Sequence, residues 1–146
     1  MLRSYGPIMD RQEQIEFLLD HYENPRNKGK LENANATMTW GNPGCGDIIT
    51  MYANVGLDEK LTEVTFEGQG CTISQASASV LTEWIKGKTL AEIESMGHEE
   101  LIDLLGRDVV MTRTRCALLS LDALKLALKE YERNKVRAEN NSAQAG

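Results

Sequence analysis

Apolar residues recur three or four positions apart in three stretches of the chain, which is the spacing of one face of an α-helix. We predict helices over Asp10–Tyr22, Ser74–Lys86 and Cys116–Lys135. Asp10 is a suitable N-cap for the first helix, and Gly87 ends the second in the C′ position. The third has the longest apolar stripe, made of Leu118, Leu121, Leu124, Leu128 and Tyr131.

Between the first two helices, the pattern changes to that of short strands. Strands are predicted around Met38 and Trp40, over Asp47–Val55, and over Leu61–Gly68. A short polar connection makes a hairpin of the last two. The chain is therefore predicted to form an α+β fold, in which helices pack on a small three-stranded antiparallel sheet. Two short helices are expected at residues 90–96 and 98–105.

The length of 146 residues is typical of one domain. We expect a single domain over residues 10–135, a disordered N-terminal extension at residues 1–9, and a disordered, polar tail at residues 136–146. The net charge of −6 argues against nucleic acid and anionic membranes as partners. The first residues lack the apolar core of a secretory signal, and unpaired thiols suit a reducing compartment, so a cytoplasmic location is expected.

The three cysteines each occupy a distinct setting. Cys45 lies between two glycines and is followed by Asp47, Cys71 lies where a glycine-rich loop enters a helix, and Cys116 begins the last helix. An odd number of widely spaced cysteines argues against a disulfide framework. Three thiolates and one carboxylate suit zinc, or iron in an iron–sulfur cluster. Three inert, buried thiols are the structural alternative.

Two of the cysteines are expected to be reactive. Cys71 and Cys116 lie at predicted helix N-termini, where unpaired N–H groups and the helix dipole favour a thiolate. Arg113 and Arg115 would add positive charge beside Cys116. At the other end of a predicted helix, His21 lies where the charged imidazolium is favoured.

Four segments of the sequence point to a known family when they are taken together. They are DHYENPRN at residues 20–27, GCGD at 44–47, FEGQGC at 66–71 and LTEWIKGK at 81–88. These segments resemble the IscU/NifU-type iron–sulfur cluster assembly scaffolds over roughly residues 10–135. The resemblance implies a scaffold rather than an enzyme. Such a scaffold accepts sulfur from a cysteine desulfurase, binds iron, builds a transient 2Fe–2S cluster and transfers it to apo-proteins.

The resemblance also implies roles for individual residues. The cluster ligands would be Cys45, Asp47, Cys71 and Cys116, with Cys116 as the persulfide acceptor. An iron or electron donor such as a ferredoxin would be a further partner. From the residues themselves, the polar, rigid turn at residues 24–27 and the exposed end around Cys45 are predicted to belong to the desulfurase-binding surface. Zinc in the cluster-free form and a homodimer in the cluster-bound form are both compatible with the resemblance.

Two departures from the family pattern change what is expected. Many members have a histidine immediately before the third cysteine, whereas this chain has Arg115. Arginine has no lone pair to offer a metal, so Asp47 gains weight as the fourth donor. Many members also carry a Leu-Pro-Pro-Val-Lys segment that an ATP-driven chaperone binds. Residues 109–114 contain no proline, which argues against delivery through that chaperone.

A zinc-dependent sulfur-acceptor branch of the family also has a basic residue before the third cysteine. Members of that branch carry an insertion between the second and third cysteines, and the spacing between Cys71 and Cys116 leaves no room for it. The main expectation is therefore a cluster scaffold. The alternative is a zinc-bound sulfur acceptor that works with a cysteine desulfurase.

Overall fold

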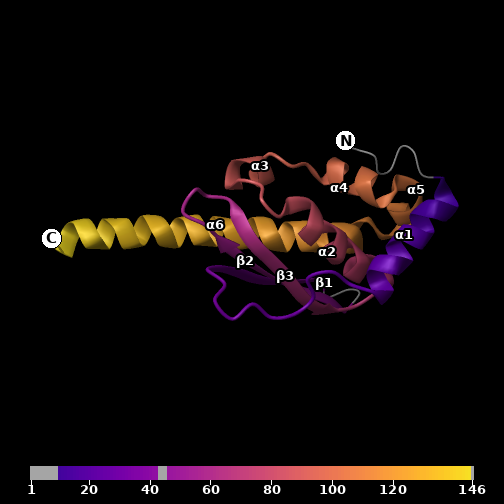
Figure 1. Cartoon of the computed structure of the whole chain (residues 1–146), viewed down its shortest axis with the longest axis horizontal. Coiled ribbons are helices and arrows are strands. Elements are labelled where there is room, and N and C mark those ends of the chain that lie inside the picture. The colour runs from indigo at the N-terminus through magenta and orange to yellow at the C-terminus, as the bar shows by residue number, and fades with distance from the viewer. Residues whose placement is uncertain (1–9, 43–45, 146) are drawn as a thin grey trace.

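The computed structural model describes residues 10–42 and 46–145. The predictions made for residues 1–9 and for Cys45 lie outside these ranges. Within them, the elements follow the order α1, β1–β3, α2–α5, a 3-10 helix and α6 (Figure 1).

The sheet is three-stranded and antiparallel, in the order β1-β2-β3, as the sequence predicts. Strand β1 spans Ala36–Asn42, β2 spans Asp47–Val55 and β3 spans Leu61–Gln69. Ile49 lies opposite Trp40, and Met51 lies opposite Met38 and Phe66. Residues directly opposite share a face of the sheet, so the fully buried Ile49, Met51 and Phe66 show which face the helices cover.

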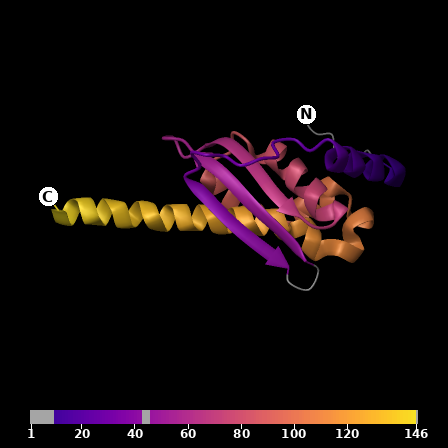
Figure 2. The same ribbon diagram turned by 90° about the horizontal axis from the view of Figure 1, so that it is seen from below.

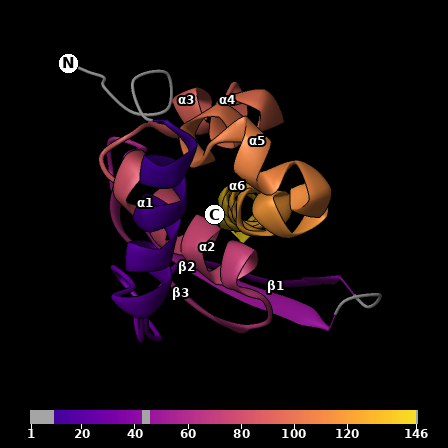
Figure 3. The same cartoon turned by 90° about the vertical axis from the view of Figure 1, so that its right-hand side faces the viewer.

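The helices lie in layers on that face. Helix α6 (Thr114–Ala145) packs on β1 and β2, and α2 (Thr72–Ile85) packs on β3 beside α6 (Figures 2 and 3). Helix α1 (Arg11–Glu23) lies against the outer side of α2. The short helices α3 (Leu90–Glu94), α4 (His98–Leu105) and α5 (Arg107–Val110), and the 3-10 helix η1 (Met111–Arg113), connect α2 to α6.

Local sequence signals account for where several helices begin and end. Asp10 caps α1 in a capping box with Glu13, as its side chain and position suggest. Gly106, with a φ of 104°, ends α4 and begins α5. The predicted stripe on α6 faces the core, because Leu121, Leu124 and Leu128 are almost completely buried. The sequence predictions did not include α5 or the 3-10 helix.

The C-terminal end differs from the prediction. Helix α6 continues to Ala145, so the disordered tail expected at residues 136–146 is wrong for residues 136–145 (Figure 1). This stretch contains no proline or glycine. The preceding turns of α6 pack against the core and are already helical, so extending the helix requires no new nucleation step. Residues 136–139 are exposed, but exposure alone does not decide between helix and coil. In the described part of the chain, no helix, α6 included, combines the length and apolar character needed to cross a membrane.

Candidate metal centre

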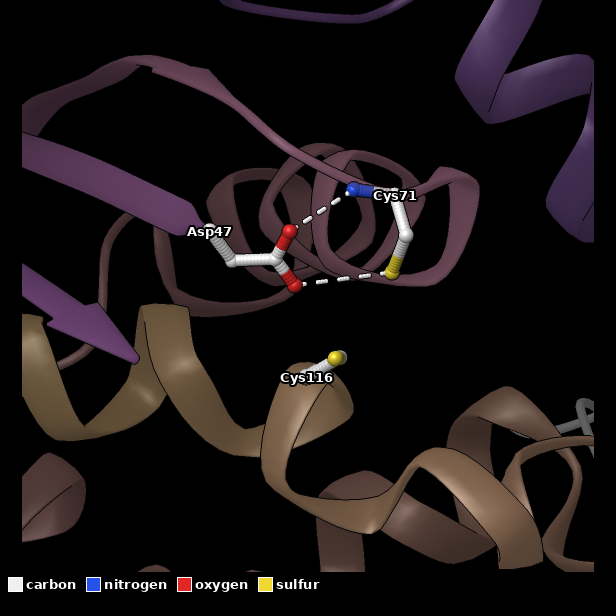
Figure 4. Close-up of side chains that lie close together, drawn as sticks. All are labelled: Asp47, Cys71 and Cys116. Carbon is white, nitrogen blue, oxygen red and sulfur yellow. Dashed lines mark hydrogen bonds between the residues drawn. The ribbon is translucent and has the colours of Figure 1, made fainter. Parts of the chain in front are cut away.

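Asp47, Cys71 and Cys116 meet at one end of the sheet (Figure 4). Asp47 begins β2, Cys71 is the N-cap of α2 directly after β3, and Cys116 lies in the first turn of α6. One ligand atom from each residue lies within 4.8 Å of the others. The fold therefore brings together three of the four donors that were predicted from the sequence. The fourth, Cys45, lies outside the described residues.

Asp47 is buried and held in place by Cys71. Its side chain is only 1% exposed. The backbone N–H of Cys71 donates to Asp47 Oδ1 at 2.9 Å, and the Cys71 thiol donates to Oδ2 at 3.6 Å. Burial raises the pKa of Asp47, but hydrogen bonds from Cys116 and Cys71 and the charge of Arg113 outweigh it, so its pKa lies below the usual value. Asp47 therefore presents a carboxylate rather than a carboxylic acid.

Cys71 is the most accessible of the three donors. Its side chain is half-buried and makes no capping hydrogen bond with α2. Ser74 Oγ donates to the Cys71 carbonyl at 3.0 Å and lies 3.9 Å from Cys71 Sγ. The Cys71 sulfur therefore lies at a helix N-terminus, where negative charge is favoured.

Cys116 differs from the sequence prediction. It is 2% exposed, and burial together with the nearby Asp47 and Cys71 raises the pKa of its thiol to about 12. The expected stabilisation of a thiolate is therefore wrong for the metal-free protein. Arg113 and Arg115 are exposed, and their charges at the Cys116 sulfur are outweighed by burial and by the Asp47 carboxylate. A bound cation reverses this balance, because a coordinating thiol loses its proton.

Small residues on α2 let α6 approach the site closely. Ala76, Ser77 and Ala78 are fully buried, and Ser77 Oγ donates to the carbonyl of Ala117, the residue after Cys116. A run of small residues such as 76–79 is typical of close helix packing. It carried no signal that would assign a role to Ser74 or Ser77, because their partners are set by the fold.

The turn at residues 24–27 is attached to α2 by partly buried hydrogen bonds. The backbone N–H of Arg26 donates to Ser79 Oγ at 2.9 Å, and Asn27 Nδ2 donates to Thr82 Oγ1 at 3.1 Å. Asn27 has a φ of 60°, in the left-handed region that asparagine tolerates better than most residues. The turn therefore has a structural role, whatever it contributes to a partner surface.

His21 is a buried neutral residue rather than an exposed cation. It is 4% exposed, its Nδ1 lies 2.7 Å from Ser79 Oγ, and burial lowers its pKa to about 4. The imidazolium expected from its position near a helix C-terminus is therefore wrong, because burial outweighs the dipole. His21 lines a cavity of about 220 Å³ away from the three donors, together with Phe17, Val80, Glu83, Trp84 and Leu104.

Comparisons with known proteins agree with this fold. Residues 13–138 match the model of the family described as NifU-like N terminal domain. The iron-sulfur cluster assembly scaffold protein IscU of Rickettsia prowazekii is 37% identical over 121 residues, which cover 81% of this chain and 91% of that protein. IscU of Azotobacter vinelandii is 36% identical over 121 residues, covering 81% and 93%.

Solved structures show the same fold. A putative iron-sulfur cluster assembly scaffold protein for the SUF system from Fervidobacterium islandicum superposes with a TM-score of 0.66 at 32% identity, covering 77% of this chain and 94% of that one. The N-terminal part of a NifU-like protein from Brucella abortus gives a TM-score of 0.69 at 23% identity, covering 81% and 93%, which is evidence for the fold alone. This chain belongs to the NifU-like N-terminal domain family.

Proposed function

We propose that this protein is a scaffold on which an iron–sulfur cluster is assembled and from which it is transferred to other proteins. The observation that carries the proposal is the convergence of Asp47, Cys71 and Cys116 within 4.8 Å, from three separate elements. Relatives named as iron–sulfur cluster assembly scaffolds that match about four-fifths of this chain support it further.

The chemistry of the donors suits this cargo. Thiolates are soft ligands that suit zinc and iron–sulfur clusters. Cys45 lies two residues before Asp47 in the sequence, and we include it as the fourth donor on the strength of the family resemblance. The cargo in this proposal is a 2Fe–2S cluster held by three sulfurs and one carboxylate oxygen.

Sulfur would arrive as a persulfide on a cysteine desulfurase. After the Cys116 thiol has released its proton to solvent, its sulfur attacks the outer sulfur of that persulfide. A new S–S bond forms on Cys116 while the S–S bond on the desulfurase breaks, which leaves a thiolate on the desulfurase. Each transferred sulfur then needs two electrons to become sulfide, and a ferredoxin-type protein is the proposed donor. Burial of Cys116 means that this step requires the docked partner to give access to the sulfur.

Asp47 would make the cluster transferable. A carboxylate is a harder and weaker ligand for iron–sulfur clusters than a thiolate, so it is the donor most easily replaced by a thiol of an apo-protein. The proposed partners are accordingly a cysteine desulfurase and apo iron–sulfur proteins, in a reducing cytoplasm where the thiols stay free. A chaperone that reads a proline-containing segment is not part of the proposal, and a homodimer is proposed only for the cluster-bound form.

The alternative is a sulfur acceptor that holds zinc. Three sulfurs and one oxygen also complete the tetrahedral shell of a single Zn²⁺ ion, so the donor set alone fits both. Metal analysis of anaerobically purified protein separates them. Brown protein with equal iron and acid-labile sulfide supports the scaffold, and colourless protein with about one zinc per chain supports the alternative. Protein that binds neither, even after reconstitution with iron and sulfide, would refute both functions.

A further inference from the structure

Gly70 lies against the Asp47 carboxylate. Strands β2 and β3 pair with Ile48 opposite Gln69. Asp47 and Gly70 are the next residues beyond this pair, one just before Ile48 and the other just after Gln69, and so they lie side by side. A Cβ atom placed on Gly70 would lie 2.1 Å from Asp47 Oδ1, 2.6 Å from its Cγ and 3.0 Å from its Cα. These separations are far shorter than van der Waals contact. No side chain at position 70 can therefore coexist with the observed position of the carboxylate.

A side chain at position 70 would displace the Asp47 carboxylate, which is one of the four proposed metal donors. Turning the Asp47 side chain away from position 70 would break the hydrogen bond from the Cys71 N–H to Oδ1 and remove Oδ2 from Cys71 Sγ. We propose that Gly70 is a positioning residue, which places the Asp47 carboxylate among the metal ligands by leaving that space empty. The inference rests on the proposed function, because it takes Asp47 to be a ligand.

Gly70 also has an unusual backbone conformation, and the effect of that conformation must be distinguished from the effect of the missing side chain. Its φ of 145° would strain any other residue, whatever surrounds it. Gly29 provides a matched control, because its φ is 143° and a Cβ placed on it meets nothing within 4 Å. Gly29→Ala therefore places alanine at a matching positive φ without a contact to the site.

Metal ions alone can serve as the probe. Four variants would be compared with the unmodified chain: Gly70→Ala, Asp47→Ala, the double variant and Gly29→Ala. The absorption spectrum of bound Co²⁺ reports which atoms coordinate it, and competition with a chelator gives the Zn²⁺ affinity. We expect Gly70→Ala to give the Co²⁺ spectrum of Asp47→Ala and to weaken Zn²⁺ binding about 10–100-fold, as loss of a positioning contact does.

The double variant tests whether Gly70 acts through Asp47. In the Asp47→Ala background, Gly70→Ala should change the Zn²⁺ affinity by less than about threefold, because the group it displaces is already gone. Gly29→Ala should keep the original spectrum and affinity. An unchanged Co²⁺ spectrum in Gly70→Ala, or the same fall in affinity in both backgrounds, would overturn the inference.

Thermal unfolding covers the case in which Gly70→Ala does not fold. Removing the carboxylate relieves the closest contacts, so the double variant should fold and melt at a higher temperature than Gly70→Ala. A double variant that is as unstable as the single one would contradict the role of Gly70. If the unmodified chain binds neither Co²⁺ nor Zn²⁺, the proposed function fails. The inference about Gly70 is still tested in that case, because the melting temperatures of the two single variants and the double variant show whether the Asp47 carboxylate occupies the space beside Gly70.

Discussion

The backbone N–H of Cys71 donates a 2.9 Å hydrogen bond to Oδ1 of Asp47, so one proposed metal ligand fixes the orientation of another. The two residues belong to different elements, because Asp47 begins β2 and Cys71 caps α2. The pairing of β2 with β3 sets the distance between them. The sheet register therefore controls the geometry of the site.

Replacing any one cysteine with serine should abolish stable cluster binding, because a hydroxyl is a poor ligand for soft metals. The measurement is the iron and sulfide content of Cys45→Ser, Cys71→Ser and Cys116→Ser after anaerobic reconstitution. Ser120→Ala, which alters a buried side chain of α6, is a control for general effects on the fold. Full iron and sulfide in two of the three cysteine variants would show that the ligand assignment is wrong.

Asp47→Ala should lengthen the lifetime of the bound cluster and slow its transfer to an apo-ferredoxin. The carboxylate is the donor most readily exchanged for water or an incoming thiol, and cluster release depends on that exchange rate. The equilibrium affinity for a single Zn²⁺ ion depends instead on the number of donors. Asp47→Ala can therefore lengthen the lifetime of the cluster and still weaken Zn²⁺ binding. Cluster absorbance followed over time, with and without acceptor, measures the effect, and Asp58→Ala in the β2–β3 turn is a control. Faster cluster loss without acceptor would make Asp47 an ordinary firm ligand.

Cys71 should react with an alkylating reagent faster than Cys116 in the metal-free protein. Cys116 is 2% exposed and burial raises its pKa to about 12, whereas Cys71 is half-buried at a helix N-terminus. Timed alkylation and peptide mass mapping at pH 7.5 would measure both rates. After incubation with a desulfurase and cysteine, by contrast, persulfide should be found mainly on Cys116. Persulfide found mainly on Cys45 or Cys71 would show that another cysteine accepts the sulfur.

Arg26→Ala should weaken desulfurase binding with little effect on stability. The Arg26 guanidinium pairs with Asp20, which is half-exposed, and water screens such a surface pair, so its contribution to stability is small. Asn27→Ala, in contrast, should cost about 1–3 kcal/mol, because it removes the hydrogen bond from Asn27 Nδ2 to Thr82 Oγ1 and strains a residue with positive φ. Binding assays and thermal unfolding of the two single variants separate these effects. Unaltered desulfurase binding by Arg26→Ala would remove the turn from the partner surface.

The stability of the metal-free protein should fall as the pH drops from about 6.5 towards 4, in part because of His21. Burial lowers the pKa of His21 from 6.5 to about 4, so in this range the unfolded chain binds the proton and the folded chain does not. The contribution is present in full above pH 6.5 and is lost as the pH falls through the folded value. Denaturant unfolding from pH 7 to 4 should show a shallower pH dependence for His21→Gln than for the unmodified chain. His98→Gln, at an exposed histidine paired with Asp122, is the control, and equal slopes for both variants would contradict the assignment.

Hydrophobic periodicity by itself determined most of the architecture. The strand over Asp47–Val55 alternates only in part, but it and the stripe of leucines on α6 each have one face to bury, which indicates a sheet with helices on one side. The motifs around Cys71 and Asp47 carried the family resemblance, because the spacing of donors along the chain is a property of the sequence. The resemblance also suggested that Cys116 belongs with them.

How these groups behave depends on the packing of the folded chain. The protonation of Cys116 and His21 was predicted wrongly. The place of each residue in its helix shows the effect of the helix dipole, but it does not show how deeply segments distant in the sequence bury the side chain. The helical end of α6 was missed, because polar composition reports exposure rather than backbone conformation. The contact between Gly70 and Asp47 arises from strand pairing across a turn. Such relationships join residues far apart in the chain, and they exist only once the register and packing are set.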